Sequence, residues 1–279
     1  MEKFYDNLSF RISTLITRAY STSFSVAVSF LGKDIREAVY SVYGFVRFAD
    51  EIVDSFHNYD KQKLLEKFEA GYYDALDSGI SLNPVLHSFQ KTVRKYNIPD
   101  KLVQAFLRSM KYDLYQKDYT TRDAMGEYIY GSAEVVGLMC LMIFLEGDEQ
   151  RYALLEEPAR KLGSAFQKVN FLRDLKADTH NLGRRYFPET AAGEFNEEIK
   201  SKIIKDIQDD FNASYPGIKA LPHKARLGVL IAYLYYLKLL KKISATPAGE
   251  LMNRRIRVPG YMKFLLMLKA YIKNMFNIL

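Results

Sequence analysis

Apolar residues recur three and four positions apart along most of this chain, which is the pattern that the buried face of an α-helix leaves in a sequence. The pattern runs through residues 8–30, 35–53, 61–76, 85–96, 101–115, 128–145, 151–175 and 224–243, and an amphipathic helix follows at 261–279. No comparable stretch alternates with period two. Because the chain has no Ser/Gly-rich linker and no internal repeat, the sequence predicts one all-α domain over residues 1–279.

Proline positions indicate where these helices end. Most prolines, Pro216 among them, fall between the periodic segments or in a first turn, where the missing amide hydrogen costs little. Pro158 is the exception, and it predicts a helix that starts at Glu157.

Two segments, 135–145 and 227–237, are apolar nearly all the way round. Such helices occupy the middle of a bundle or line an apolar cavity within it. Both are shorter than the roughly 20 residues that cross a bilayer, so we do not expect an integral membrane protein. The N-terminus lacks the features of a secretory signal and the single cysteine, Cys140, forms no internal disulfide, so the expected location is cytoplasmic.

The net charge of the 279 residues is +7, and it is unevenly distributed. Residues 211–279 hold twelve lysines and arginines against one acid, Glu250. This asymmetry favours an anionic partner, either a phospholipid surface or a phosphorylated small molecule, although lysines on solvated helix faces give the same count. No nucleic acid is expected as a partner, because zinc-finger spacing, a recognition helix and aromatic RNA-binding motifs are all missing from the sequence.

Two groups of oxygen-bearing side chains share a four-residue spacing. Asp50 and Asp54 lie on one face of a predicted helix whose apolar neighbours indicate burial. Asn170, Asp174 and Asp178 form a second stripe. Either pattern alone fits a solvated face. A buried carboxylate pair, however, needs a cation, and two such groups in one chain favour a hard metal ion such as Mg²⁺.

Basic residues beside these acids extend the interpretation. Arg47, Arg173 and the pair Arg184 and Arg185 can donate to phosphate oxygens that a metal leaves free. Together with the apolar helices, they predict a substrate with a diphosphate head and a hydrocarbon tail. Zinc is a poor alternative, because the four histidines are scattered and only one cysteine is present.

Longer motifs around these residues resemble the squalene and phytoene synthase family. The run at 169–178, Val-Asn-Phe-Leu-Arg-Asp-Leu-Lys-Ala-Asp, followed by Gly-Arg-Arg-Tyr-Phe-Pro at 183–188, resembles one family signature. The block 47–54, with Tyr40 and Tyr43 upstream, resembles another. Residues 20–24 and 128–139 add matches in family order. The ending Val-Gly-Leu-Met at 136–139 is more similar to bacterial carotenoid-type phytoene synthases than to membrane-anchored squalene synthases.

The resemblance implies an isoprenoid synthase type helical bundle around a central apolar cavity. The implied reaction is a Mg²⁺-dependent head-to-head condensation of two geranylgeranyl diphosphates, through a cyclopropyl (prephytoene) diphosphate, to phytoene in carotenoid biosynthesis. Mg²⁺, with Mn²⁺ as the alternative ion, would bind the catalytic aspartates and one amide, namely Asp50, Asp54, Asn170, Asp174 and Asp178. Tyr128 and Tyr236 would lie near the reacting carbons. The substrates would contact Ser21, Ser23, Phe24, Tyr43, Arg47, Ala133, Val136, Gly137, Gln167, Asn170 and Arg173.

Alternatives exist inside and outside this family. Two farnesyl diphosphates would give squalene or dehydrosqualene. Squalene formation would consume NADPH, a cofactor that is not expected because the sequence has no nicotinamide fingerprint. A non-catalytic assembly factor on the same scaffold is disfavoured, because all four aspartates are retained. Two positions depart from the family pattern: Glu134 stands where glycine is more usual, and Thr22 where some members carry a basic side chain.

The last predicted helix offers a separate interaction. Lys263, Lys269 and Lys273 share one face, largely opposite Phe264 and Leu268. This pattern suits an anionic membrane surface, and it would place the protein on the inner face of the membrane as a peripheral protein. A closing helix of the bundle is the alternative.

Overall fold

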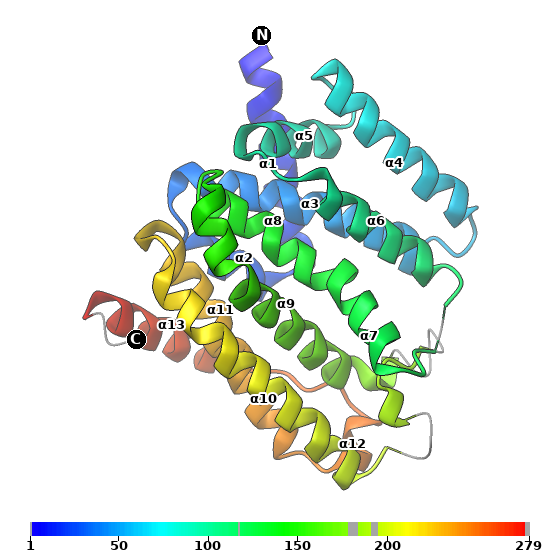
Figure 1. Ribbon diagram of the computed structural model, residues 1–279, viewed down its shortest axis with the longest axis vertical. Helices are drawn as coiled ribbons and strands as arrows, with labels where there is room; N and C mark the ends of the chain where they lie inside the picture. Colours follow the sequence, from blue (N-terminus) through cyan, green and yellow to red (C-terminus); the bar gives the residue numbers. More distant parts are fainter. Residues whose placement is uncertain (1, 117, 178–183, 191–194, 277–279) are drawn as a thin grey trace.

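The computed structural model describes residues 2–116, 118–177, 184–190 and 195–276. Within these ranges the chain is a bundle of helices, and the only strand-like pairing is an isolated bridge between Asp118 and Arg185. The predicted all-α class is therefore confirmed (Figure 1). The elements are α1 (Glu2–Tyr20), α2 (Thr22–Ser29), α3 (Lys33–Ser55), α4 (Lys61–Ser78), α5 (Pro84–Tyr96), α6 (Asp100–Asp113), α7 (Arg122–Ile129), η1 (Tyr130–Glu134), α8 (Val135–Phe144), α9 (Glu149–Ala177), η3 (Pro188–Thr190), α10 (Glu197–Ala220), α11 (His223–Ser244), α12 (Ala248–Leu251) and α13 (Gly260–Met275).

Two predicted segments are interrupted in the structure. The segment 8–30 divides at Ser21, whose extended backbone starts α2 and whose hydroxyl accepts a hydrogen bond from the amide of Phe24. The segment 128–145 contains a π-helical turn, η1, between α7 and α8. A π-helical turn accommodates an extra residue and changes which side chains share a face, and such turns are frequent at functional sites. Apolar periodicity detects neither interruption, because the pattern continues across both.

The predictions drawn from two prolines are wrong. Pro216 lies inside α10, a helix that the sequence pattern did not reveal, and Pro158 lies inside α9. The two helices pack closely at this point: a Cβ atom added to Gly217 would stand only 2.4 Å from the Cβ of Pro158. A proline in a helix interior costs on the order of 3 kcal/mol. Tertiary packing between α9 and α10 therefore offsets a local preference for ending both helices.

Buried side chains form two clusters. One is built mainly by α3, α4, α5, α6 and α8, and its centre includes Phe45 stacked on Phe89 at 4.0 Å between ring centroids. The other is built mainly by α7, α9, α10 and α11. Among the residues that the structure describes, one helical stretch, Arg122–Phe144, is long and apolar enough to cross a membrane. Half of its 18-residue apolar window is buried in the bundle, as expected for a core helix.

Gly228 brings α11 against α2. A Cβ atom at this position would stand 2.9 Å from the backbone oxygen of Ala27 and 2.5 Å from a methyl carbon of Leu31. We therefore expect Gly228→Ala to lower the free energy of unfolding by about 1–3 kcal/mol in urea denaturation. Gly126→Ala is the matched control, because no atom lies within 4 Å of the added carbon and alanine favours the helix. Equal stabilities of the two variants would contradict this packing.

Candidate active site

An apolar cavity of about 370 Å³ lies where the two buried clusters meet. Its walls come from α2, α3, η1, α8, α9, α10 and α11. Val136 and Phe144 of α8 and Val229 and Ala232 of α11 line it, as expected for the two segments that are apolar all round. Cys140 is also in the wall, and burial raises the pKa of its thiol to about 12.

A second hollow of about 600 Å³, here named the mouth, adjoins this cavity. Four side chains line both hollows: Phe24, Phe166, Ala232 and Tyr236. The lining of the mouth is rich in hydroxyl and cationic groups. They come from the end of α1, the start of α2, α9, α11, the segment before α13, and α13 itself: Tyr20, Ser21, Thr22, Ser23, Arg173, Tyr235, Arg255, Arg257 and Lys263. The mouth is therefore suited to an anionic group whose apolar part continues into the cavity.

The acid pair of α3 is compensated by two guanidinium groups. Arg47 binds the carboxylates of Asp50 and Glu51, and it stacks over the ring of Tyr20. Arg184 donates to Asp54 at 3.0 Å. Desolvation and the neighbouring Asp54 carboxylate together raise the pKa of Asp50 to about 6. Asp50 thus binds a proton more readily than an ordinary aspartate, even with both arginines nearby.

Asp113 lies beneath this pair and was not predicted. It is buried at the end of α6, and it accepts a hydrogen bond from the hydroxyl of Tyr128 at 2.9 Å. Arg184 donates to its backbone oxygen at 3.2 Å and lies 3.8 Å from its carboxylate. Burial, opposed by Arg184, raises the pKa of Asp113 to about 7. Asp113 thereby connects Tyr128 to the cation that compensates Asp54.

The second acidic group lies on α9. Asp174 is held by Arg173 and by Arg255, each at 2.6 Å. The amide oxygen of Asn170 accepts a hydrogen bond from the hydroxyl of Tyr236 at 3.2 Å. Asp178 falls outside the described residues.

Two tyrosines connect the acidic groups. Tyr43 of α3 stacks on Phe24 and lies within electrostatic reach of Asp50 and of Tyr236 on α11, and burial raises its pKa. Tyr236 in turn binds Asn170 and feels the charge of Asp174. The α3 acids and the α9 oxygens therefore border one region, next to the mouth and the cavity.

The other predicted residues occupy distinct places. Ala133, Val136, Gly137 and Gln167 line the cavity, whereas Ser23 lines the mouth. Tyr128 lines neither hollow and packs in an aromatic group with Tyr119, Phe171 and Tyr186.

Two charged side chains point elsewhere. Glu134 is paired with Arg160 at 2.7 Å and is not part of the apolar wall. Close packing beside it comes from Gly163 of α9, where an added Cβ would stand 3.0 Å from the Cα of Glu134. Arg185 is exposed and pairs with Asp118, apart from its neighbour Arg184.

Comparisons with known proteins decide the family. The profile described as "Squalene/phytoene synthase" matches residues 17–261. The chain belongs to this family. A squalene/phytoene synthase relative, phytoene synthase 2 of Solanum lycopersicum, is 26% identical over 92% of this chain and 87% of its own length. The 15-cis-phytoene synthase of Synechococcus elongatus is 25% identical over 89% of this chain and 87% of its own.

Solved structures of the same family share the fold. A dehydrosqualene synthase superposes with a TM-score of 0.82 at 24% identity, covering 96% of this chain and 98% of the other. Squalene synthase HpnC of Alicyclobacillus acidocaldarius gives a TM-score of 0.75 at 21% identity, covering 89% of this chain and 95% of the other. The expected isoprenoid synthase type bundle is thereby confirmed.

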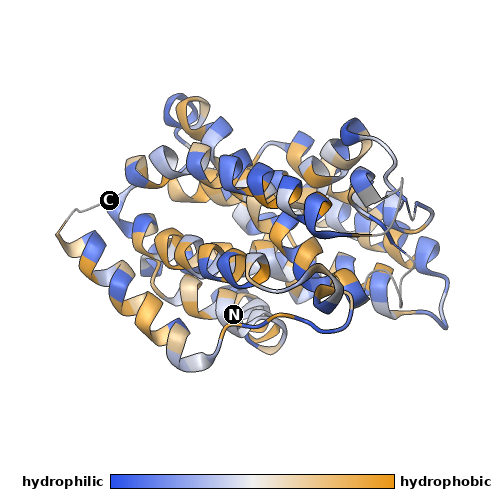
Figure 2. Cartoon of the chain, turned by 90° about the horizontal axis from the view of Figure 1, so that it is seen from below, coloured by the Kyte–Doolittle hydropathy of each residue, from blue (hydrophilic) through white to orange (hydrophobic). Residues whose placement is uncertain are grey.

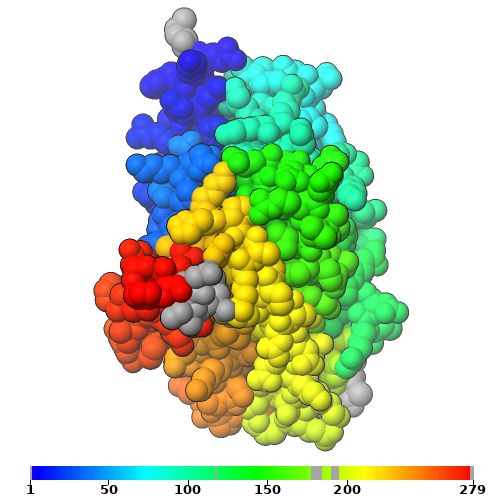
Figure 3. All heavy atoms as spheres, turned by 60° about the vertical axis from the view of Figure 1, so that its left-hand side comes forward, coloured from blue at the N-terminus to red at the C-terminus, as the bar shows by residue number. Residues whose placement is uncertain are grey.

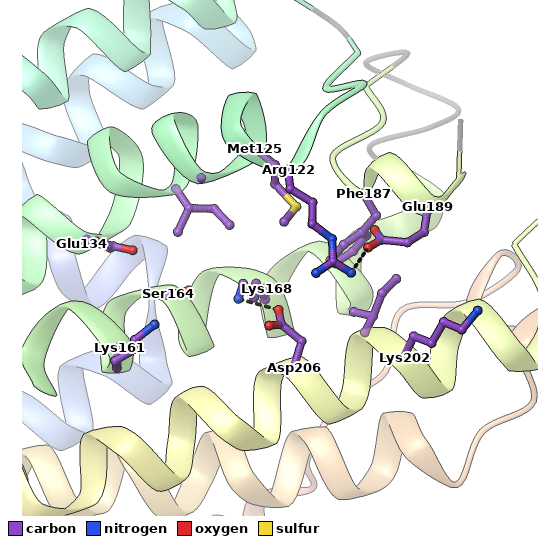
Figure 4. A pocket seen from close by; sticks show the side chains of 13 residues that line it. Arg122, Met125, Glu134, Lys161, Ser164, Lys168, Phe187, Glu189, Lys202 and Asp206 are labelled. Carbon is purple, nitrogen blue, oxygen red and sulfur yellow. Dashed lines mark hydrogen bonds and ion pairs between the residues drawn. The ribbon is translucent and has the colours of Figure 1, made fainter. Parts of the chain in front are cut away.

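A third hollow, of about 210 Å³, lies between α7, α9 and α10 (Figure 4). Its charged side chains are paired, some of them with residues outside the lining. Lys168 binds Asp206 and Asp210 at 2.5 and 2.7 Å, and Arg122 binds Glu189 at 2.8 Å. This hollow shares no lining residue with the mouth or with the apolar cavity.

The oxygen-bearing side chains of the site come in pairs, and oxygen ligands are the kind that Mg²⁺ prefers. Among the residues that the structure describes, no group of three or more His, Cys, Asp or Glu side chains is placed to hold a metal ion. Asp50 with Asp54, and Asp174 with Asn170, each supply two oxygens. Mg²⁺ usually takes one or two carboxylates and completes its octahedron with water and substrate phosphate. Paired oxygens beside a basic mouth are donors of the kind that such coordination uses, and burial with the neighbouring Asp54 carboxylate raises the pKa of Asp50.

The raised pKa of Asp113 predicts a pH effect on stability. Its folded pKa of about 7 exceeds the unfolded value of 3.8, so the folded state holds the proton more tightly. Between about pH 4 and pH 7 the contribution of Asp113 to the free energy of unfolding therefore falls as pH rises. Asp113→Asn keeps an acceptor for Tyr128 but cannot ionise. We expect it to remove part of this fall, on the order of 1 kcal/mol or more.

Urea denaturation at pH 5, 6, 7 and 8 with chelator present measures this effect. Asp209→Asn, at an exposed acid of α10, is the control and should leave the slope unchanged. If Asp113→Asn and the native protein show the same pH dependence, Asp113 is not the buried proton site.

Proposed function

We propose that this protein joins two geranylgeranyl diphosphates head to head, with Mg²⁺, to give phytoene. The observation that carries the proposal is the junction of three features: paired oxygen ligands on α3 and α9, a mouth lined by hydroxyls and cations, and an apolar cavity that shares four lining residues with it. A diphosphate with a long hydrocarbon tail matches this combination. The family assignment supports the same reaction class.

Residues of the mouth, together with Arg47 against Tyr20 at its edge, would bind the leaving diphosphate. Arg47 and Arg173, with the hydroxyls of Ser21 and Ser23, would donate hydrogen bonds to its oxygens, and charge-assisted bonds of this kind are the strong ones. Mg²⁺ held by Asp50, Asp54, Asn170, Asp174 and Asp178 would act as a Lewis acid, so that the allylic carbon–oxygen bond can break.

The cavity would control the carbocation that remains. The allylic double bond next to the diphosphate of the second chain would attack it, and loss of a proton from the attacked carbon would close the ring of a cyclopropyl diphosphate. A second ionisation and rearrangement, followed by loss of another proton, gives the linear product. The released diphosphate is a suitable proton acceptor. The rings of Phe24, Phe166 and Tyr236 at the junction of the hollows would stabilise positive charge by about 0.5–2 kcal/mol each, while the apolar walls exclude water.

Similarity to phytoene synthases favours geranylgeranyl diphosphate, the C20 donor. The Solanum lycopersicum and Synechococcus elongatus proteins carry that name, and each matches most of this chain. A shorter match, 25% identical over 70% of this chain, is the 4,4'-diapophytoene synthase of Staphylococcus haemolyticus, which keeps a C15 donor as the second candidate.

Product analysis distinguishes these donors. The purified protein is incubated with Mg²⁺ and geranylgeranyl or farnesyl diphosphate, with and without NADPH, and the extracted hydrocarbons are identified by mass spectrometry. We expect phytoene from the C20 donor without NADPH. Product from the C15 donor alone would overturn the phytoene assignment. A product that requires NADPH would indicate squalene-type chemistry, and no product from either donor would reject the condensation.

Asp50→Asn tests the metal role directly. We expect kcat/KM to fall by a factor on the order of 100 or more, because the leaving diphosphate loses one ligand of its counter-ion. In the native protein, Mg²⁺ with inorganic pyrophosphate should raise the melting temperature, and in the variant this rise should disappear. Without Mg²⁺ at pH 8, the variant should be at least as stable as the native protein, since it lacks a desolvated charge. Asp209→Asn should behave like the native protein in all three measurements.

A further inference from the structure

Helix α13 presents its apolar side to solvent. Its exposed large side chains recur at helical spacing and form one continuous stripe: Tyr261, Phe264, Leu265, Leu268, Tyr271, Ile272 and Met275, continued by Phe276. Tyr261 and Phe264 keep 67% and 61% of their surface exposed. In Figure 2, α13 runs along the edge of the molecule from the end marked C, and hydrophobic turns lie at that edge.

The side of the same helix that faces the protein is mixed. Ala270 is fully buried, Met262 and Met267 pack against the second cluster, and Asn274 is buried among them. Lys263 lies 5.6 Å from the ring centroid of Tyr235 on α11. A surface helix normally keeps its large apolar side chains on the core side alone. A contiguous exposed apolar stripe of this size is unusual in a monomer and marks a surface that meets something apolar. α13 therefore closes the bundle with one side and presents an apolar stripe to solvent with the other.

Charge and position identify the occupant. The last quarter of the chain, residues 211–279, carries twelve basic residues and one acid, and Arg257 and Lys269 are exposed at or beside α13. A second copy docking by the same face would bring two such basic segments together, and their like charges would repel. An anionic bilayer instead complements the charge outside the stripe and solvates the stripe itself.

The stripe also adjoins the mouth. Lys263, Phe264 and Met267 of α13 line the mouth together with Val26 of α2, an exposed apolar residue. Figure 3 shows α13, in red, on the outside of the molecule beside the yellow and orange of α10 and α11. A bilayer against α13 would therefore lie at the entrance through which a hydrocarbon tail reaches the cavity.

We propose that α13 docks this protein on an anionic lipid bilayer, with its apolar stripe in the boundary between headgroups and acyl chains and the mouth opening at the lipid surface. The docking itself does not depend on the proposed reaction, because it needs neither substrate nor metal. It is measured without them, so its failure leaves the synthase assignment untouched.

Vesicle sedimentation of the full chain tests this surface. The protein is mixed with vesicles of phosphatidylcholine alone or with 30% phosphatidylglycerol, in 0.1 M and 0.5 M NaCl, without Mg²⁺ or substrate. We expect binding to the anionic vesicles that weakens at high salt. Leu265→Gln with Leu268→Gln should reduce the partition coefficient by on the order of tenfold or more, because two large apolar side chains leave the bilayer. Lys269→Glu should weaken binding to anionic vesicles only.

The matched control replaces two leucines elsewhere that are even more exposed, Leu82→Gln with Leu154→Gln, and should bind like the native chain. Circular dichroism checks that every variant melts at the native temperature. Equal loss in the control pair, equal binding to neutral vesicles, or no binding of the native chain would overturn the proposal. Sedimentation velocity without lipid tests whether a second copy of the chain covers the stripe instead. A dimer that the Leu265 and Leu268 pair variant abolishes, with no vesicle binding, would identify a second copy as the occupant instead.

Discussion

Desolvation of neighbouring carboxylates is the constraint on which the site depends. Asp50 and Asp54 are carried by a helix whose other faces are packed in the core, so their mutual repulsion is not screened as it would be on an open surface. Arg47 pairs with Asp50, and Arg184 pairs with Asp54. Arg184 also contacts Asp113, which accepts a hydrogen bond from Tyr128. Two guanidinium groups and this hydrogen bond thus stabilise the acid pair.

The hollow beside this charge survives because the helices around it are irregular where they border it. Pro158 and Gly217 face each other at the crossing of α9 and α10, and both line the cavity. The π-helical turn η1 contributes Ser132 and Ala133 to the same wall. Regular helices with large side chains would close such a space, since protein interiors pack to the density of organic crystals. Irregular backbone and small residues therefore keep the cavity open, and the packing around them stabilises it.

Much of the fold and part of the site follow from the sequence for identifiable reasons. Repeats of 3.6 residues locate helices wherever one face is buried, and paired acids in an apolar context predict an ion site at Asp50 and Asp54. This reasoning does not find helix α10, because its many charged residues obscure the apolar pattern and Pro216 locally indicates a helix end. Asp113 escapes it as well: an isolated acid on an amphipathic helix has no sequence signature, and only the fold brings Tyr128 and Arg184 to it. The directions of Glu134 and Arg185 are likewise set by partners distant in sequence, Arg160 and Asp118.

Cys140 lies in the cavity wall and can report on access to the cavity. It is the chain's single cysteine, and its pKa of about 12 leaves almost no thiolate at neutral pH. Since the thiolate is the reactive form, a small alkylating reagent that enters the cavity modifies this partly exposed residue only slowly. The rate of that modification reports on access to the cavity without introducing any label, and a tail that fills the cavity should slow it.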